Sequence, residues 1–464
     1  MFSGRRRVYD EAKDTDYVDE HEADIKRRRG NAQESEEEAE QRRRSRSAYF
    51  LAFPSLVTLA LESLLAAPKR ALGGLPTEQL LDCVPLHLRE RVRAGLLTTM
   101  AATAAAGTNT EGINSYDVGA WLTYEGMTHI VGPPPATSAF RFFMGALTKH
   151  LDSSVSLETI LRMDFRDQTA LTNAGLAGLL RRLPHLQSLC LAGCKQLTDA
   201  AFSLSNEGTL FTHLAYLNVN DVAQISFKTL KGMVDRASVS LRTLKVAGLP
   251  LQDKQLAELC QSALGLENVK IRLTKATSNV ISVLFTTLPA LHTLDASFTT
   301  FRNMRWATAL FPDGRETSSL TKLHLLTSPN KTSPYEVRPT DLANLYTYHP
   351  QLRILSFGPD IRVRASTLAS KAPPPLEKLF CSHLPDLRHV SCYQLLKQYA
   401  HLRFLDLSFA SLASGDLGKV LQHHEEEGGP PLLPHLTSLD LSNTQVSDTV
   451  LFFFGKSHLY HVID

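Results

Sequence analysis

One apolar pattern recurs through about two-thirds of this 464-residue chain and constrains its fold more than any other feature. Its clearest copy is Leu186-Gln-Ser-Leu189-Cys-Leu191, with leucines at the first, fourth and sixth positions. Successive copies lie 24 to 34 residues apart, a length that accommodates one strand and one returning helix. The copies begin at Ile160, Leu186, Leu214, Leu241, Leu266, Leu291, Leu320, Leu352, Leu376, Leu402 and Leu436.

The alternation within each copy predicts a short strand that buries one side. Alternate residues of a strand point to opposite sides, so the fourth and sixth positions of a copy point together into a core. One unit has too little apolar surface to close a core alone, so each unit depends on its neighbours. Thr172, Thr198 and Ser447 stand where they can cap the helix that follows. We therefore expect an α/β solenoid of about eleven repeats over residues 151–464, a horseshoe with strands on its concave side.

The units resemble leucine-rich repeats, and the copy at Leu186 is similar to their cysteine-containing subclass. Cys194 stands at the cysteine position of that subclass, and Leu197-Thr198-Asp199 matches its usual ending. The subclass is typical of F-box/leucine-rich-repeat ubiquitin-ligase receptors and of related fungal repair and mitotic-exit adapters. The resemblance covers the repeats as a fold, but only one or two units as a subclass. Most other copies have a different residue near the cysteine position, such as Asn220, Gly248 or Asn443.

The N-terminal residues 1–47 carry many charges and almost no large apolar side chains. Such a segment cannot bury enough apolar surface to offset its ordering entropy, so we expect a disordered tail. Its arginine-rich clusters suit either recognition by a nuclear import receptor or a solvated, self-neutralising tail. The acidic run Glu34–Glu40 competes for the same arginines, which argues against direct binding of nucleic acid.

Residues 48–99 have apolar side chains at helical spacing, and we expect residues 100–150 to form a linker and an N-terminal cap. The segment from Ser55 to Leu64 resembles an elongin-C-binding box. This resemblance implies that Leu56, Ala60 and Leu64 lie on one helical face and contact an adapter. Ala60 stands where the box favours cysteine.

A second pattern follows, with Leu75-Pro76 and then Leu80-Leu81. It resembles the opening of an F-box or the cullin-contacting half of an elongin-type box. The resemblance implies a Skp-type or elongin-C-type adapter and a cullin as partners. Glu78 departs from the cullin half, and the tryptophan-bearing third helix of a full F-box is missing. The alternative interpretation is that these helices only cover the open end of the first repeat.

No motif of the chain indicates catalysis, a metal or a cofactor. The sequence has no phosphate-binding glycine loop, no His-Glu-x-x-His and no Gly-x-Ser-x-Gly. Its six cysteines are scattered without a Cys-x-x-Cys pair, so we expect buried thiols rather than a zinc site. The run from His423 to Glu427 is interpreted as a solvated loop and not as a set of metal ligands. We therefore expect a protein that is not an enzyme and holds no metal.

The concave face is the predicted binding surface for a protein substrate. Its mixture of basic, acidic and aromatic side chains suits a protein better than a nucleic-acid backbone, and the net charge of the chain is only +2. No apolar run approaches the roughly 18 residues that span a membrane, and we expect a nuclear or cytoplasmic protein. The substrate-binding residues that we predict are Tyr216, Asn218, Arg242, Lys245, Asn268, Lys270, His292, Lys322 and His324.

These patterns support three functional hypotheses. The leading one is a substrate receptor of a cullin–RING ubiquitin ligase, in which residues 48–99 bind the adapter and the repeats hold the substrate. The alternative is a nuclear scaffold that organises a protein complex through its concave face without a ligase. The third is association with ribonucleoprotein through the arginine-rich tail.

Overall fold

The computed structural model describes most of the repeat region and a short stretch before it. The described residues are 127–133, 159–203, 210–300, 303–308, 317–326, 335–358, 361–428, 432–446 and 461–463, with part of 140–147. The predicted tail and the predicted box-like helices of residues 48–99 lie outside them.

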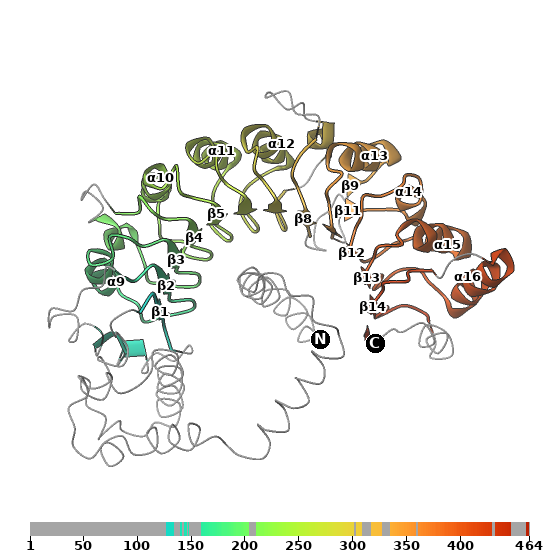
Figure 1. The fold of residues 1–464 in the computed structure, drawn as a ribbon, viewed down its shortest axis with the longest axis horizontal. Helices are drawn as coiled ribbons and strands as arrows, with labels where there is room; N and C mark the ends of the chain where they lie inside the picture. The colour runs from blue at the N-terminus through green and yellow to red at the C-terminus, as the bar shows by residue number, and fades with distance from the viewer. Residues whose placement is uncertain are drawn as a thin grey trace, which may run out of the picture. The chain divides into compact units, whose positions relative to one another are not determined.

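A 13-stranded sheet forms the backbone of the described region, and its strands follow one another in sequence order. Every pairing between neighbours in this sheet is parallel, so each connection crosses over the same face and the chain advances by one strand per unit. Figure 1 shows the strands along the inner side of the repeat array and the helices along its outer side. The strands are β1 (His129–Val131), β2 (Arg162–Asp164), β3 (Ser188–Cys190), β4 (Tyr216–Asn218), β5 (Thr243–Lys245), β6 (Asn268–Lys270), β7 (Thr293–Asp295), β8 (Lys322–Leu325), β10 (Ile354–Phe357), β12 (Lys378–Cys381), β13 (Phe404–Asp406), β14 (Ser438–Asp440) and β15 (His461–Ile463).

In the 13-stranded sheet, the second residue of each strand from β2 to β14 comes from the repeated apolar pattern. The register of this sheet pairs these residues with one another. None of their side chains is more than 3% exposed, so they form one continuous row through the core. Burying a side chain of this size contributes about 1.5–3 kcal/mol. The row consists of Met163, Leu189, Leu217, Leu244, Val269, Leu294, Leu323, Leu355, Leu379, Leu405 and Leu439.

Helices return the chain between strands and cover the other side of this row, which confirms the predicted strand-and-helix unit (Figure 1). Two returns contain 3₁₀ turns instead, η1 (Asp199–Ala201) and η3 (Arg305–Thr308). A small second sheet pairs β9 (Tyr335–Glu336) with β11 (Ile361–Arg362). The helices are α9 (Asn173–Leu180), α10 (Phe227–Arg236), α11 (Asp253–Ser262), α12 (Ser278–Thr287), α13 (Pro339–Tyr348), α14 (Ala365–Leu368), α15 (His389–Gln398) and α16 (Ser414–Glu427).

The predicted capping residues lie at the starts of these returning segments. The Thr172 hydroxyl accepts a hydrogen bond from the Gly175 amide at 3.2 Å and caps α9. The Thr198 hydroxyl accepts one from the Ala200 amide at 3.3 Å, although the segment that it caps is the 3₁₀ turn η1. Both caps are confirmed, while Ser447 lies outside the described residues.

The residue after the cap ties one repeat to the next. Asn173 Oδ1 accepts from the Thr198 amide at 2.9 Å, and Asp199 Oδ1 accepts from the Ser226 amide at 2.7 Å. Asp253 Oδ1 accepts from the Thr277 amide at 2.6 Å in the same way. An acidic or amide side chain in the first helical turn therefore satisfies an amide of the following unit, besides its favourable position at a helix N-terminus.

The cysteine position of the subclass satisfies a buried carbonyl. Cys194 donates through its thiol to the Phe165 carbonyl of the preceding repeat at 2.9 Å. Three threonines occupy the same position relative to their strands, and each hydroxyl donates to the carbonyl three residues earlier, at 2.7–2.8 Å. These threonines are Thr274, Thr299 and Thr444. Threonine is thus the counterpart of Cys194 in those repeats. In the last of them this position is Thr444, and not Asn443 as the sequence analysis had it.

The interpretation of residues 423–427 as a solvated loop was wrong. They form the last turn of α16, which ends at Glu427 before Gly428. Lys397 Nζ lies 2.8 Å from Glu427 Oε2, and the Tyr393 hydroxyl donates to the same carboxylate oxygen. These contacts link the end of α16 to the neighbouring helix α15.

The sheet extends beyond the eleven recognised copies at both ends. β1 pairs with β2 and β15 pairs with β14, both in parallel. In β1 only Ile130 carries the buried position, so the pattern is too short to recognise in the sequence. Phe140 and Phe143 are buried against Phe165, with ring centres 5.6 and 6.0 Å from the Phe165 ring. The described residues therefore form a leucine-rich-repeat solenoid whose first unit is covered by aromatic side chains.

Candidate binding face

Because alternate residues of a strand point to opposite sides, the first and third residues of each main-sheet strand point away from the buried row and form the concave face. Figure 1 shows these strands along the inner side of the array. Because the sheet is in register, side chains at equivalent positions of neighbouring repeats lie side by side. The predicted residues Tyr216, Asn218, Lys245, Asn268, Lys270, Lys322 and His324 all occupy first or third strand positions.

Two predicted residues lie elsewhere. Arg242 and His292 each precede the strand by one residue, outside its alternation. Arg242 donates to the Val239 carbonyl at 2.9 Å, and its Nε lies 3.8 Å from Glu267 Oε1. His292 Nδ1 donates to the Ala290 carbonyl at 2.6 Å. Both side chains are thus engaged with the segment that leads into the strand. The predicted adapter contacts Leu56, Ala60, Leu64, Leu75, Pro76, Leu80 and Leu81 lie outside the described residues.

The concave face of β4 to β6 is organised around positive charge. Lys245 Nζ lies 5.1 Å from the centre of the Tyr216 ring, within cation–π range. Lys245 is directly opposite Lys270 in the register, and Lys270 is opposite Asp295 on its other side. Asp295 is 5% exposed, and its carboxylate accepts a hydrogen bond from the Ser297 amide at 3.0 Å. Asp295 thus accepts a hydrogen bond within its own turn and also lies opposite Lys270 across the pairing of β6 and β7.

The concave face of β8 to β13 has a different character. His324 Nδ1 lies 2.9 Å from the Ser356 hydroxyl, which links β8 to β10. Farther along, the rings of Phe380 and Phe404 pack with centres 4.6 Å apart. The adjacent Asp406 is largely buried, and loss of solvation raises the pKa of its carboxyl. This half of the face presents an aromatic pair on β12 and β13, beside lysines at the first positions of β8 and β12.

A turn position that the sequence analysis did not identify follows strands β2 to β7 and β12 to β14. Four residues beyond the buried row, the backbone adopts the left-handed region with φ between 56° and 74°. In this conformation the residue's amide donates to a carbonyl of the next repeat, for example Leu273 to Ser297 at 3.0 Å and Phe409 to Ser442 at 2.9 Å. The left-handed turn position is occupied by Asp167, Gly193, Asp221, Gly248, Leu273, Phe298, His383, Phe409 and Asn443. Its signal in the sequence is the recurrence of Asp, Gly or Asn at this spacing.

The five cysteines among the described residues are buried, as predicted, and Cys83 lies outside those residues. Burial raises the pKa of the Cys190 thiol to about 11 and the pKa values of Cys194, Cys260 and Cys392 to about 12. Cys381 is raised well above its usual value for the same reason. At neutral pH these groups are protonated thiols, which are poor nucleophiles.

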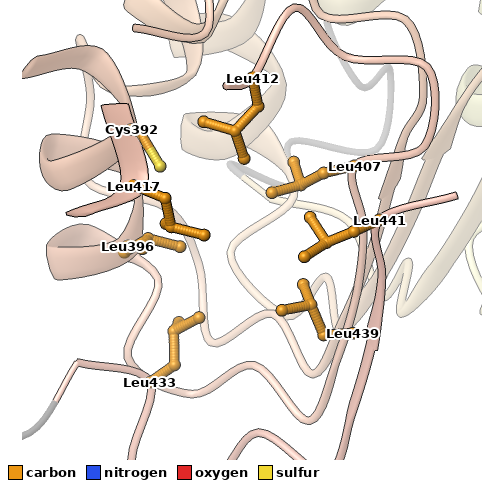
Figure 2. A pocket seen from close by; sticks show the side chains of 8 residues that line it. All are labelled: Cys392, Leu396, Leu407, Leu412, Leu417, Leu433, Leu439 and Leu441. Carbon is orange, nitrogen blue, oxygen red and sulfur yellow. The ribbon is translucent and has the colours of Figure 1, made fainter. Parts of the chain in front are cut away.

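A cavity of about 10 Å³ lies between α15, α16 and the last strands. Figure 2 shows Cys392 and seven leucines around it, so its wall is apolar throughout. The volume is at most enough for one water molecule, and an apolar cavity of this kind stays empty. It is a packing defect of the core rather than a substrate pocket.

Within the described residues, no three His, Cys, Asp or Glu side chains are placed to hold a metal ion. The described helices are also too short or too polar to cross a membrane.

Comparison with known proteins gives matches to solved structures alone. No protein family matches the sequence, and no curated protein matches it. A chain from the Rad7 and Elc1 complex of yeast is 13% identical, with 90% of this chain and 96% of that chain covered and a TM-score of 0.49. An internalin from Listeria monocytogenes is 15% identical over 79% of this chain and 93% of its own, with a TM-score of 0.42. A chain from the complex of TLR13 with ssRNA13 is 17% identical, with 69% of this chain and 40% of that chain covered and a TM-score of 0.40. At these values the matches carry no information on function.

Proposed function

We propose that this chain is a protein-binding adapter that serves as the substrate receptor of a cullin–RING ubiquitin ligase. The observation that carries the proposal is the box-like pattern directly ahead of the repeats, where Leu56, Ala60 and Leu64 have the spacing of an elongin-C-binding box. The Leu75-Pro76 and Leu80-Leu81 pattern that follows supplies the second contact, with a cullin or a Skp-type adapter.

The repeat array supports the other half of this function. Its concave face is a continuous sheet surface with aromatic and charged side chains in register, which is suited to hold a folded or extended protein. The receptor acts by holding the substrate near the ligase, which raises the effective concentration of the reacting groups. The proposal rests on the box pattern and not on the likeness to the Rad7 and Elc1 structure, whose TM-score is below 0.5.

Co-purification of the full chain with elongin C, with a Skp-type protein and with cullins tests the proposal. We expect an adapter to co-purify with the unmutated chain and to be lost from Leu56→Asp and from Leu75→Asp/Leu80→Asp. Leu61→Asp is the matched control, because in the predicted helix it lies about 140° around the axis from Leu56. Absence of any adapter from the unmutated chain, or its retention by both variants, rules the proposal out.

The competing function is a scaffold that binds its partners through the concave face without a ligase. It is favoured by two sets of side chains on that face, the lysines of β5 and β6 and the Phe380–Phe404 pair. Both sets belong to the repeats and not to residues 48–99. Deletion of residues 50–97 separates the two functions. A scaffold keeps all its partners after this deletion, whereas a receptor loses its adapter and cullin and keeps only its substrate.

A further inference from the structure

The left-handed turn position divides the repeats into two groups. Asp167, Gly193, Asp221 and Gly248 follow strands β2 to β5, and these residue types tolerate a positive φ. Leu273 and Phe298 follow β6 and β7 with φ of 56° and 58°. Bulky side chains rarely adopt this conformation because Cβ crowds the following carbonyl oxygen. The array has the same turn with Asp or Gly one repeat earlier, so the fold itself does not require leucine or phenylalanine there.

Burial does not offset this unfavourable conformation. The Leu273 side chain is 52% exposed, and Phe298 is only partly buried. The Arg272 guanidinium lies over the Phe298 ring, 5.4 Å from its centre, so the ring has a cation on one side. Unfavourable local conformations that persist on a surface are a mark of functional sites.

Charge at the same place points in the same direction. Lys245 and Lys270 are directly opposite in neighbouring strands, and like charges so placed are unfavourable for the sheet. Arg272 adds a third cation two residues beyond Lys270. Asp295 lies opposite Lys270 and is the acidic residue among the strand positions of β5 to β7, so three cations stand here against one acid. Three cations therefore adjoin two partly exposed apolar side chains.

We propose that these five residues, Lys245, Lys270, Arg272, Leu273 and Phe298, bind an acidic protein segment that carries aliphatic or aromatic side chains. We call them the β5–β7 patch. Carboxylates of the segment pair with the three cations, and an apolar side chain of the segment packs between Leu273 and Phe298. The inference rests on the proposed function only in so far as the array holds a protein, and it names the class of protein that is held.

A display library of random 12-residue peptides, panned against the full chain, tests the chemistry of the segment. We expect the enriched peptides to combine Asp or Glu with Leu, Ile, Phe or Trp. Fluorescence anisotropy of one such peptide is then expected to show binding that weakens as salt is raised. Enrichment of basic or uncharged peptides, or no enrichment, overturns the proposal. So does equal competition by a single-stranded oligonucleotide, which would show that the patch binds phosphate.

Variants of the full chain test the location. Lys245→Glu/Lys270→Glu is expected to weaken the selected peptide at least tenfold. Leu273→Asn is expected to weaken it by about tenfold while the midpoint of thermal unfolding stays level or rises, because Asn suits the left-handed region. A structural role for Leu273 predicts the opposite change in the midpoint. Phe409→Asn is the matched control, since it makes the same replacement outside the patch and should leave affinity unchanged. Normal binding by Leu273→Asn, or equal loss by Phe409→Asn, overturns the assignment.

The same preparations keep this inference separate from the proposed function. Lys245→Glu/Lys270→Glu is expected to retain any adapter, and Leu56→Asp is expected to retain the peptide. If the peptide binds and no adapter does, the ligase function fails and the patch stands. If an adapter binds and no acidic peptide is enriched, the patch fails and the ligase function stands.

Discussion

The turns after β2 to β5 and the turns after β6, β7, β12 and β13 share one backbone and differ in their side chains. In the first group acidic residues and glycines alternate, and a Cβ added at Gly193 or Gly248 would meet the Asp167 or Asp221 carboxylate of the preceding turn. In the second group His383 and Phe409 stack with ring centres 4.6 Å apart. The first group is specified by the backbone conformation, whereas the second has side chains that the backbone disfavours. Equivalent positions in a repeat array can thus serve either the fold or a surface.

The concave face also divides into two regions, but at a different place along the array. Lys245 and Lys270 lie together on β5 and β6, while Phe380 and Phe404 pack together on β12 and β13. One region suits an acidic partner and the other an apolar one, although both are built on the same buried row. The four predictions below test whether the two regions differ only at the surface, and they run from the largest expected effect to the smallest.

Truncation of a leucine in the buried row should lower the free energy of unfolding by the same amount in both regions. Leu189→Ala in the first region and Leu405→Ala in the second each remove a fully buried side chain. We expect each to lower the free energy of unfolding by about 2–5 kcal/mol, from lost apolar burial and the cavity left behind. Urea unfolding followed by circular dichroism measures the losses. A difference of several kcal/mol between the two would mean that the regions differ in the core as well as at the surface.

Placing a bulky residue in a turn of the first region should be costly. Gly193→Leu puts a Cβ at φ 74° and against the Asp167 carboxylate. We expect the free energy of unfolding to fall by about 2–3 kcal/mol. Gly418→Ala is the control, because that position lies within α16 with open space around it and should be neutral or slightly stabilising. If Gly193→Leu is tolerated, the two groups of turns are interchangeable and the comparison fails.

Acid should weaken the second region first. Burial lowers the pKa of His349 from 6.5 to about 4, so the unfolded chain takes up this proton at a higher pH than the folded one. Stability from the neutral ring is therefore complete above pH 6.5 and is lost as the pH falls towards 4, by about 2 kcal/mol at pH 5. Amide hydrogen exchange at pH 7 and pH 5 should show protection falling in β8 and β10 before it falls in β3 to β5. His349→Gln should remove most of this dependence of stability on pH. His213→Gln, at an exposed histidine, should leave the dependence unchanged.

Relieving a turn of the second group should give the smallest effect. Leu273→Asn replaces an exposed leucine with a residue type that the array uses at position 443. We expect the free energy of unfolding to rise by about 1 kcal/mol, because the left-handed conformation is less unfavourable for Asn. Thermal unfolding of the full chain measures the change. A loss of stability would mean that Leu273 stabilises the fold through packing, although about half of its side chain is exposed.

Much of the fold was predictable because its signal is local. Eleven apolar triplets located strands β2 to β14, and Thr172 and Thr198 were recognised as caps from their place after the strand. The prediction failed where the local pattern was short or misleading. β1 has only Ile130 at the buried position. Residues 423–427 were predicted to form a loop in the longest spacing between copies, whereas they end α16 and contact Tyr393 and Lys397 of α15.

The candidate site was predictable only in part. Alternation placed Tyr216, Lys245 and Lys270 on the concave face, but it placed Arg242 and His292 there as well, one residue before their strands. Nothing in a single repeat indicates that Lys245 faces Lys270, or that Arg272 lies over Phe298. These pairs join residues about 25 positions apart, and the register of neighbouring strands brings them together.

By itself the sequence determined that this chain stacks strands and helices around a row of leucines, because apolar periodicity acts within one repeat. The tertiary structure decided which surface side chains meet and where the backbone must turn left-handed. That backbone conformation is set by an amide that donates to the next repeat, as in Leu273 to Ser297. A hydrogen bond between repeats depends on how two units stack, so the position that distinguishes the two regions becomes visible only when the repeats are assembled.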